Sequence, residues 1–83
     1  MMNVRENEII DGDKTYRNLG LVKGVFLVEL VESVEGKEEQ TCGLLDHQLG
    51  SFESVPLGYR VDLEPGTKIV VVSSPKGTSW QLA

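Results

Sequence analysis

The reactive side chains of this sequence are few, and the densest group of them is Cys42, Asp46 and His47. A cysteine thiolate beside an imidazole can act as a nucleophile, and a nearby carboxylate can orient that imidazole. If the segment around Cys42 is a strand, an offset of five residues places Cys42 and His47 on opposite faces. Only a turn at Asp46 would bring them together. The pattern favours a buried structural cysteine and a surface histidine over a catalytic pair.

Acidic residues crowd one predicted turn, where carboxylate oxygens could bind a divalent cation. These residues are Glu32, Glu35, Glu38 and Glu39. A solvated hairpin tip is the more ordinary interpretation of such a cluster. Zinc needs three or four ligands, which one cysteine and one histidine cannot supply within a single chain. Glycine-rich phosphate loops are absent from the sequence. We therefore expect neither a metal ion nor another cofactor.

Aromatic side chains on a β-sheet can stack against a sugar or an apolar ring, and this is the second kind of site that the residue types allow. Aromatic residues are more often part of a core, and Trp80 near the end of the last strand is expected to close it. Both interpretations stay open. The candidate ligand-binding residues are Tyr16, His47, Phe52, Tyr59 and Trp80.

The charge pattern argues against nucleic acid as a partner. The net charge is −5, and the eight basic residues are scattered, whereas a phosphate backbone is bound by clustered lysine and arginine. The apolar runs are much shorter than the roughly 18–20 residues of a membrane-spanning helix, so no membrane partner is expected. The N-terminus lacks the pattern of a signal peptide. A single cysteine excludes an internal disulfide, and we expect a cytoplasmic protein.

Turn residues divide the first half of the chain into strands. Residues 1–10 predict a ragged first strand, and the Asp-Gly-Asp sequence at residues 11–13 ends it, because aspartate and glycine favour turns. A longer strand is predicted over residues 21–33. Residues 34–37 then predict a hairpin turn with glycine at positive φ, and residues 38–45 the return strand.

Residues 46–56 have no clear strand pattern. Leu45, Leu49 and Phe52 have the spacing of one helix face, although Gly50 lies between them. We expect a loop here, with one short helical turn near residues 46–52.

The last third of the chain predicts a three-stranded antiparallel meander. Its strands cover residues 59–64, 68–74 and 79–83, and the first of them alternates apolar and polar residues. Pro-Gly chemistry predicts a turn at residues 64–67, and a second turn is predicted at residues 74–77. Turns that recur about every 8–12 residues are typical of a small barrel or sandwich.

Two predicted strands, residues 21–33 and 69–72, are apolar on both faces and need cover on both sides. In the first of them Phe26, Val28 and Leu30 share one face, and the opposite face is equally apolar. In so short a chain one sheet cannot bury both strands. The sheet closes or folds over itself, or a second copy covers the excess. In the second case the contact residues are Val25, Leu27, Val31, Val70 and Val72.

The sequence thus predicts one all-β domain over residues 1–83, a small antiparallel barrel or sandwich of about five to seven strands with a C-terminal meander. The favoured function is a non-enzymatic interaction or assembly module that acts as a homo-oligomer. A β-barrel that binds a small molecule or protein ligand, with aromatic residues lining a pocket or an intersubunit cleft, is the alternative. An enzyme that uses Cys42 and His47 is the third hypothesis.

Overall fold

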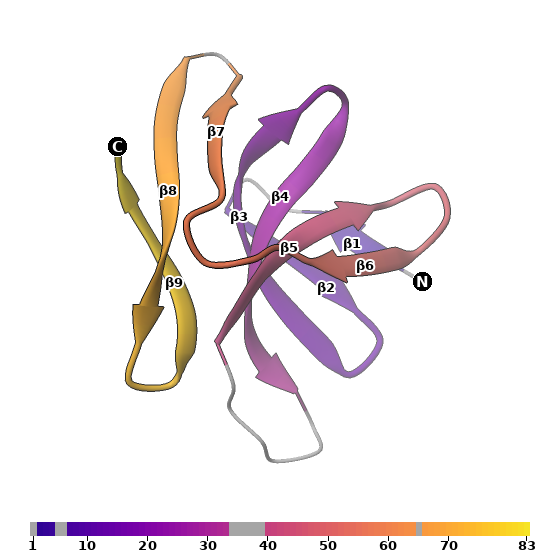
Figure 1. Ribbon diagram of the computed structural model, residues 1–83. Helices are drawn as coiled ribbons and strands as arrows, with labels where there is room; N and C mark the ends of the chain where they lie inside the picture. The colour runs from indigo at the N-terminus through magenta and orange to yellow at the C-terminus, as the bar shows by residue number, and fades with distance from the viewer. Residues whose placement is uncertain (1, 5–6, 34–39, 65) are drawn as a thin grey trace.

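The computed structural model describes residues 2–4, 7–33, 40–64 and 66–83, which form two antiparallel β-sheets (Figure 1). The strands of these ranges are β1 (Met2–Val4), β2 (Glu8–Asp11), β3 (Lys14–Val22), β4 (Val25–Ser33), β5 (Thr41–Asp46), β6 (Ser51–Ser54), β7 (Arg60–Leu63), β8 (Thr67–Ser74) and β9 (Gly77–Leu82). Strands β1 to β6 form one sheet in chain order, and β7 to β9 form the other. The described residues contain no helix long and apolar enough to cross a membrane.

Strand β4 is shared by two cores, one on each of its faces. Val28 contributes to the first core, which also contains residues of β2, β3 and β5. The six-stranded sheet curls around this core, since Tyr16 of β3 reaches Phe52 of β6 with ring centroids 5.3 Å apart. Leu27 points the other way, into a second core with Leu63 and Ile69 of the three-stranded sheet. Both faces of β4 are therefore covered by its own chain.

The two sheets meet at two single bridges without closing into a barrel. At one side the Glu64 N–H, just after β7, donates to the Leu21 carbonyl of β3 over 2.9 Å. At the other side Gln40, just before β5, forms a parallel bridge with Gly77 of β9. The second core thus lies between β3, β4 and β5 on one side and the C-terminal meander on the other, in a sandwich-like arrangement.

The predicted all-β antiparallel class and the C-terminal meander are confirmed, and of the two architectures the sandwich is the one found. The described residues contain more strands than the five to seven expected, because two predicted segments are each divided and β6 lies where a loop was expected. The first strand is split into β1 and β2, which pair with each other. The predicted hairpin turn at residues 34–37 lies outside the described residues.

The continuous strand expected over residues 21–33 is wrong, because the chain reverses at Lys23 and Gly24. Both residues have positive φ, +50° and +85°. This combination defines a type I′ turn, whose twist matches that of a two-residue β-hairpin. Val22 consequently pairs with Val25 across the turn. Nearby, Gly20 lies at a register shift between β3 and β4, which indicates a β-bulge at this glycine.

The helical turn expected near residues 46–52 is a four-residue hairpin turn between β5 and β6. The Gly50 N–H donates to the Asp46 carbonyl over 2.7 Å, which is the spacing of one helical hydrogen bond. Gly50 then takes a φ of +69° and directs the chain into β6. The chain makes a single helix-like hydrogen bond here, and Ser51–Ser54 continues as a strand.

Candidate functional site

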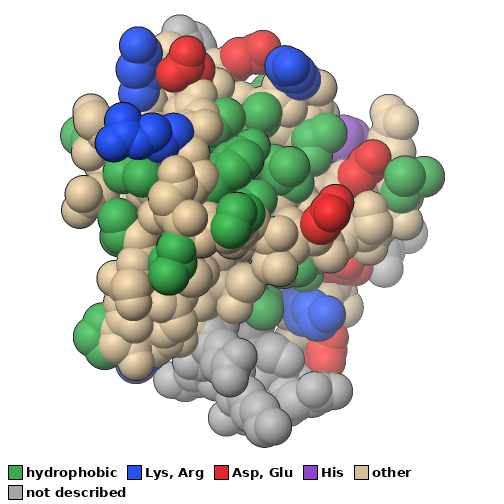
Figure 2. All heavy atoms as spheres, in the orientation of Figure 1, with side chains coloured by type: hydrophobic (Ala, Val, Ile, Leu, Met, Phe, Trp, Pro, Cys, Tyr) green, Lys and Arg blue, Asp and Glu red, His purple; other side chains and the backbone are tan. Residues whose placement is uncertain are grey.

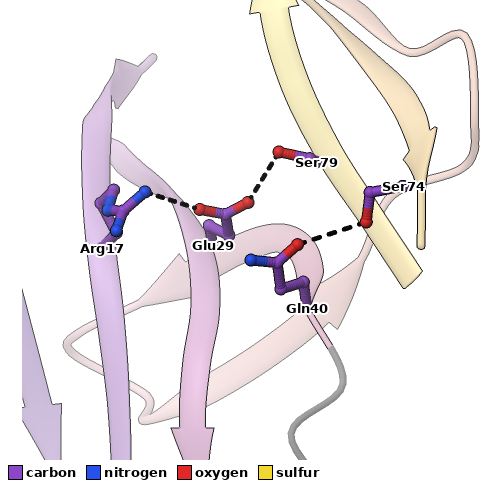
Figure 3. Close-up of polar contacts among 5 residues, drawn as sticks. All are labelled: Arg17, Glu29, Gln40, Ser74 and Ser79. Carbon is purple, nitrogen blue, oxygen red and sulfur yellow. Dashed lines mark hydrogen bonds and ion pairs between the residues drawn. The ribbon is translucent and has the colours of Figure 1, made fainter. Parts of the chain in front are cut away.

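A buried carboxylate is the most unusual polar group in the described part of the chain. Glu29 of β4 has 1% of its side chain exposed and lies between the two sheets (Figure 3). Arg17 of β3 donates from Nη1 to Glu29 Oε1 over 3.3 Å, and Ser79 of β9 donates from Oγ to Oε2 over 3.0 Å. A buried charge is costly unless it is paired and hydrogen-bonded, and here both oxygens are satisfied. Glu29 therefore joins β9 of the second sheet to β3 and β4 of the first.

Cys42 lies next to this carboxylate, directly opposite Glu29 in the pairing of β4 with β5. The side chain is fully buried, and the Cys42 N–H donates to Thr78 Oγ1 over 3.0 Å. Burial raises the pKa of the thiol to about 11, with a further increase from the negative charge of Glu29 and a smaller opposing effect from Thr78. At neutral pH Cys42 is a neutral thiol, which is a poor nucleophile.

We expect the raised pKa of Cys42 to make the fold less stable in alkali. The folded pKa of about 11 exceeds the ordinary value of 9.0, so the folded state disfavours the thiolate. The stabilising contribution is complete below pH 9 and is lost as the pH rises toward 11. Urea unfolding at pH 8 and pH 10.5 measures this loss, and Cys42→Ala should show a shallower pH dependence than the wild type. If the free energy of unfolding fell equally with pH in both proteins, the pH dependence would not come from Cys42.

His47 and Asp46 do not complete a catalytic group with Cys42. Strand β5 separates the thiol from His47, and five residues of extended chain cover roughly 16 Å. His47 is exposed, and its ring is T-shaped relative to the Phe26 ring, with centroids 5.2 Å apart. Asp46 Oδ1 accepts the N–H groups of Gln48 and Leu49 and thereby fixes the turn. The buried cysteine and surface histidine favoured by the sequence are confirmed.

The aromatic candidates are divided between the two cores. Tyr16 is fully buried against Phe52 in the first core. Tyr59 and Trp80 are half-buried and pack against the second core, between the sheets. The structure therefore brings Tyr16 and Phe52 together, whereas Tyr59 and Trp80 each pack against the second core. His47 stands apart from both pairs.

A shallow groove of about 390 Å³ lies between β7 and the β3–β4 turn. Its walls combine apolar surface with opposite charges, from Val22, Lys23, Arg60, Val61, Asp62 and Glu64. None of the aromatic candidates lines it. Figure 2 shows hydrophobic side chains gathered over the seam between the two sheets, with charged residues around them. The sequence could not indicate this groove, because it forms from segments about 40 residues apart.

The five residues predicted to contact a second copy differ in how far they are buried within the chain. Leu27 has no exposed surface, because it is enclosed between the two sheets. It is therefore removed from the set of residues that could touch a second copy. The other four are half-buried in the chain, namely Val25, Val31, Val70 and Val72.

The outer edge of β9 is a candidate contact surface that the amino-acid sequence did not indicate. Leu82 at its end has 68% of its surface exposed. Trp80, two residues earlier, is half-buried on the same face of the sheet, opposite Val71 of β8. In Figure 1 the end of β9 lies at the outer margin of the molecule, with no drawn segment beyond it. The one signal in the sequence is that Gly77–Leu82 contains no charged residue.

Among the described residues, no group of three or more histidine, cysteine, aspartate or glutamate side chains is arranged to hold a metal ion. The acidic cluster at the predicted hairpin tip lies outside the side chains that the structure describes. Comparison of the chain with models of protein families, with curated protein sequences and with solved structures found no match.

Proposed function

We propose that this chain is a non-enzymatic interaction module that works by self-association. The observation that carries the proposal is the outer edge of β9, where Leu82 is 68% exposed and the strand bears no charge. An open strand edge offers unpaired backbone donors and acceptors to another strand, and soluble proteins usually block such edges. An edge left open and uncharged is suited to a contact.

The polar side chains support the non-enzymatic part of the proposal. Cys42 is buried and protonated, and Asp46 caps a turn. Glu29, the buried carboxylate, has both oxygens engaged by side chains of its own chain. Catalysis requires polar groups that converge on a space for substrate. These groups instead have structural partners.

A small-molecule ligand is the second candidate function, and the groove beside β7 favours it. Lys23 and Arg60 line the groove together with Asp62 and Glu64. A small zwitterion would therefore match the charges on its walls. A ligand that binds only the folded protein raises its melting temperature. A thermal-shift screen of amino acids and short peptides tests this candidate, and Arg60→Ala should remove any shift that arises in the groove.

Self-association is tested by sedimentation velocity and light scattering on the wild-type chain. The protein concentration should span about 10 μM to 1 mM, since a small strand-edge contact is expected to have an affinity in this range. We expect the average mass to rise from monomer toward dimer as the concentration increases. A strictly monomeric protein over the whole range would overturn the proposed function.

A further inference from the structure

We propose that the free edge of β9 pairs with the same edge of a second copy, antiparallel, about a twofold axis that passes through Gln81. Trp80 of one copy then lies opposite Leu82 of the other. The two three-stranded sheets become one continuous sheet across the dimer. This inference rests on the proposed self-association and names the surface that performs it.

The hydrogen bonds of β9 show which backbone groups face outward. The Thr78 N–H donates to the Gln40 carbonyl over 2.8 Å, on the side away from β8. Along a strand, alternate residues direct their N–H and C=O groups to the same side. Trp80 and Leu82 therefore present their N–H and C=O groups to the outer edge. In agreement, the Ala83 N–H points inward and donates to β8.

Strand β5 covers only the first part of this edge. The Gln40 carbonyl accepts a hydrogen bond from the Thr78 N–H, and the Cys42 N–H donates one to the Thr78 hydroxyl. From Cys42 onward the backbone of β5 pairs with the β6 side and not with β9. The Cys42 carbonyl accepts a hydrogen bond from the Val55 N–H, and Gly43 pairs with Ser54. The part of β9 beyond Ser79 has no neighbour on its outer side among the described residues.

The charges of the sheet edges favour β9 as the edge that meets a copy of itself. The chain carries a net charge of −5, so two copies repel each other, and this repulsion is smallest where the surfaces that meet carry no charge. The β6 edge is four residues long and carries the exposed Glu53. The β7 edge carries the exposed Arg60 and Asp62 and is partly bridged by Leu21. β9 is free of charge. The β1 edge of the first sheet is uncharged as well, but it is only three residues long, Met2–Val4, and β9 is the longer of the two.

The side chains of β9 are self-complementary in the proposed register. Leu82 and Trp80 share the face that carries Ile69 and Val71, their partners on β8. In the twofold pair the exposed Leu82 of each copy packs against Trp80 of the other, so the apolar contact is made twice. Cross-strand contacts between aromatic and aliphatic residues stabilise paired strands. Gln81 meets Gln81 of the second copy on the opposite face.

The first experiment replaces the exposed apolar side chain. Leu82→Asp should raise the dimer dissociation constant roughly 100-fold, because the dimer loses two Leu82–Trp80 contacts and gains two charges at the pairing edge. Leu49→Asp is the matched control, since Leu49 is 80% exposed in the turn between β5 and β6 and the charge change is identical. We expect Leu49→Asp to dimerise like the wild type. Circular dichroism and the urea midpoint confirm that both variants are folded.

The second experiment tests the register by cross-linking. Gln81→Cys places two cysteines directly opposite each other at a non-hydrogen-bonded pair, where the Cα atoms are about 4.5 Å apart and a disulfide can form. Mild oxidation with diamide, which takes up the two electrons and two protons of the thiols, should give a covalent dimer. Gln48→Cys, in the exposed turn after β5, is the control and should give little. The native Cys42 is buried and unreactive.

The outcomes separate the inference from the proposed function. A monomeric wild type overturns both. A wild type that associates while Leu82→Asp still associates equally well, and Gln81→Cys cross-links no more than Gln48→Cys, overturns the β9 contact and leaves self-association through another surface. A dissociated Leu82→Asp together with a covalent Gln81→Cys dimer establishes the contact and its register.

Discussion

Leu27→Ala should destabilise the fold by about 2–5 kcal/mol, which is comparable to the whole stability of a marginally stable domain of this size. Leu27 has no exposed surface and packs against Leu63 and Ile69, so the truncation leaves a cavity between the sheets. Urea unfolding followed by the fluorescence of Trp80 measures the loss. Trp80 is the one tryptophan of the chain and packs against the same core.

Leu49→Ala is the control for this substitution, because Leu49 is 80% exposed and loses the same atoms. It should change the free energy of unfolding by less than about 0.5 kcal/mol. The cost of Leu27→Ala should not depend on protein concentration, since the cover of Leu27 comes from its own chain. A cost that disappears on dilution would mean that a second copy supplies the cover instead.

Gly77→Ala should cost about 3 kcal/mol or more, because two effects act at this glycine. Its φ is +133°, a conformation that residues with a Cβ rarely adopt. An added Cβ would also collide with the carbonyl oxygen of Gln40 across the bridge between β9 and β5. The bridge would have to open, with loss of the hydrogen bonds from Gln40 to Lys76 and from Thr78 to Gln40. The urea midpoint of the variant measures the cost.

Gly58→Ala separates the two effects. Gly58 also has positive φ, +83°, but an added Cβ there meets no atom within 4 Å. Its cost should be about 1–2 kcal/mol, from backbone strain alone. If the two variants lost the same amount, the close approach of Gln40 to Gly77 would contribute nothing, and the sheets would be held together elsewhere.

Local chemistry was sufficient for most of the strands and turns. Alternating residues predicted β7, and glycine with aspartate predicted the turn between β2 and β3, because these features depend on backbone preferences of a few neighbouring residues. The turn at Lys23 and Gly24 was missed for a reason of the same kind. Lysine rarely takes positive φ, so the Lys-Gly pair gave a weaker signal than Asn-Gly would have given.

The candidate sites were harder to predict than the strands. The interpretation of Cys42 as buried and of His47 as exposed was confirmed, because a free cysteine is most often a core residue and His47 lies in the turn after β5. The partners of the buried residues were not predicted. Glu29 looked like one acid among many in the sequence, and its burial depends on Ser79, 50 residues away, and on Arg17 of the neighbouring strand.

The sequence by itself determined that this chain is built of short antiparallel strands, that it ends in a meander, and that β4 needs cover on both faces. These properties follow from hydrophobic periodicity and turn chemistry, which act over a few residues. Only the tertiary structure decided what supplies the cover, which carboxylate is buried and which strand edge stays open. Each of these depends on how distant strands are placed against one another, because burial and pairing are properties of the contact between strands and not of either strand alone.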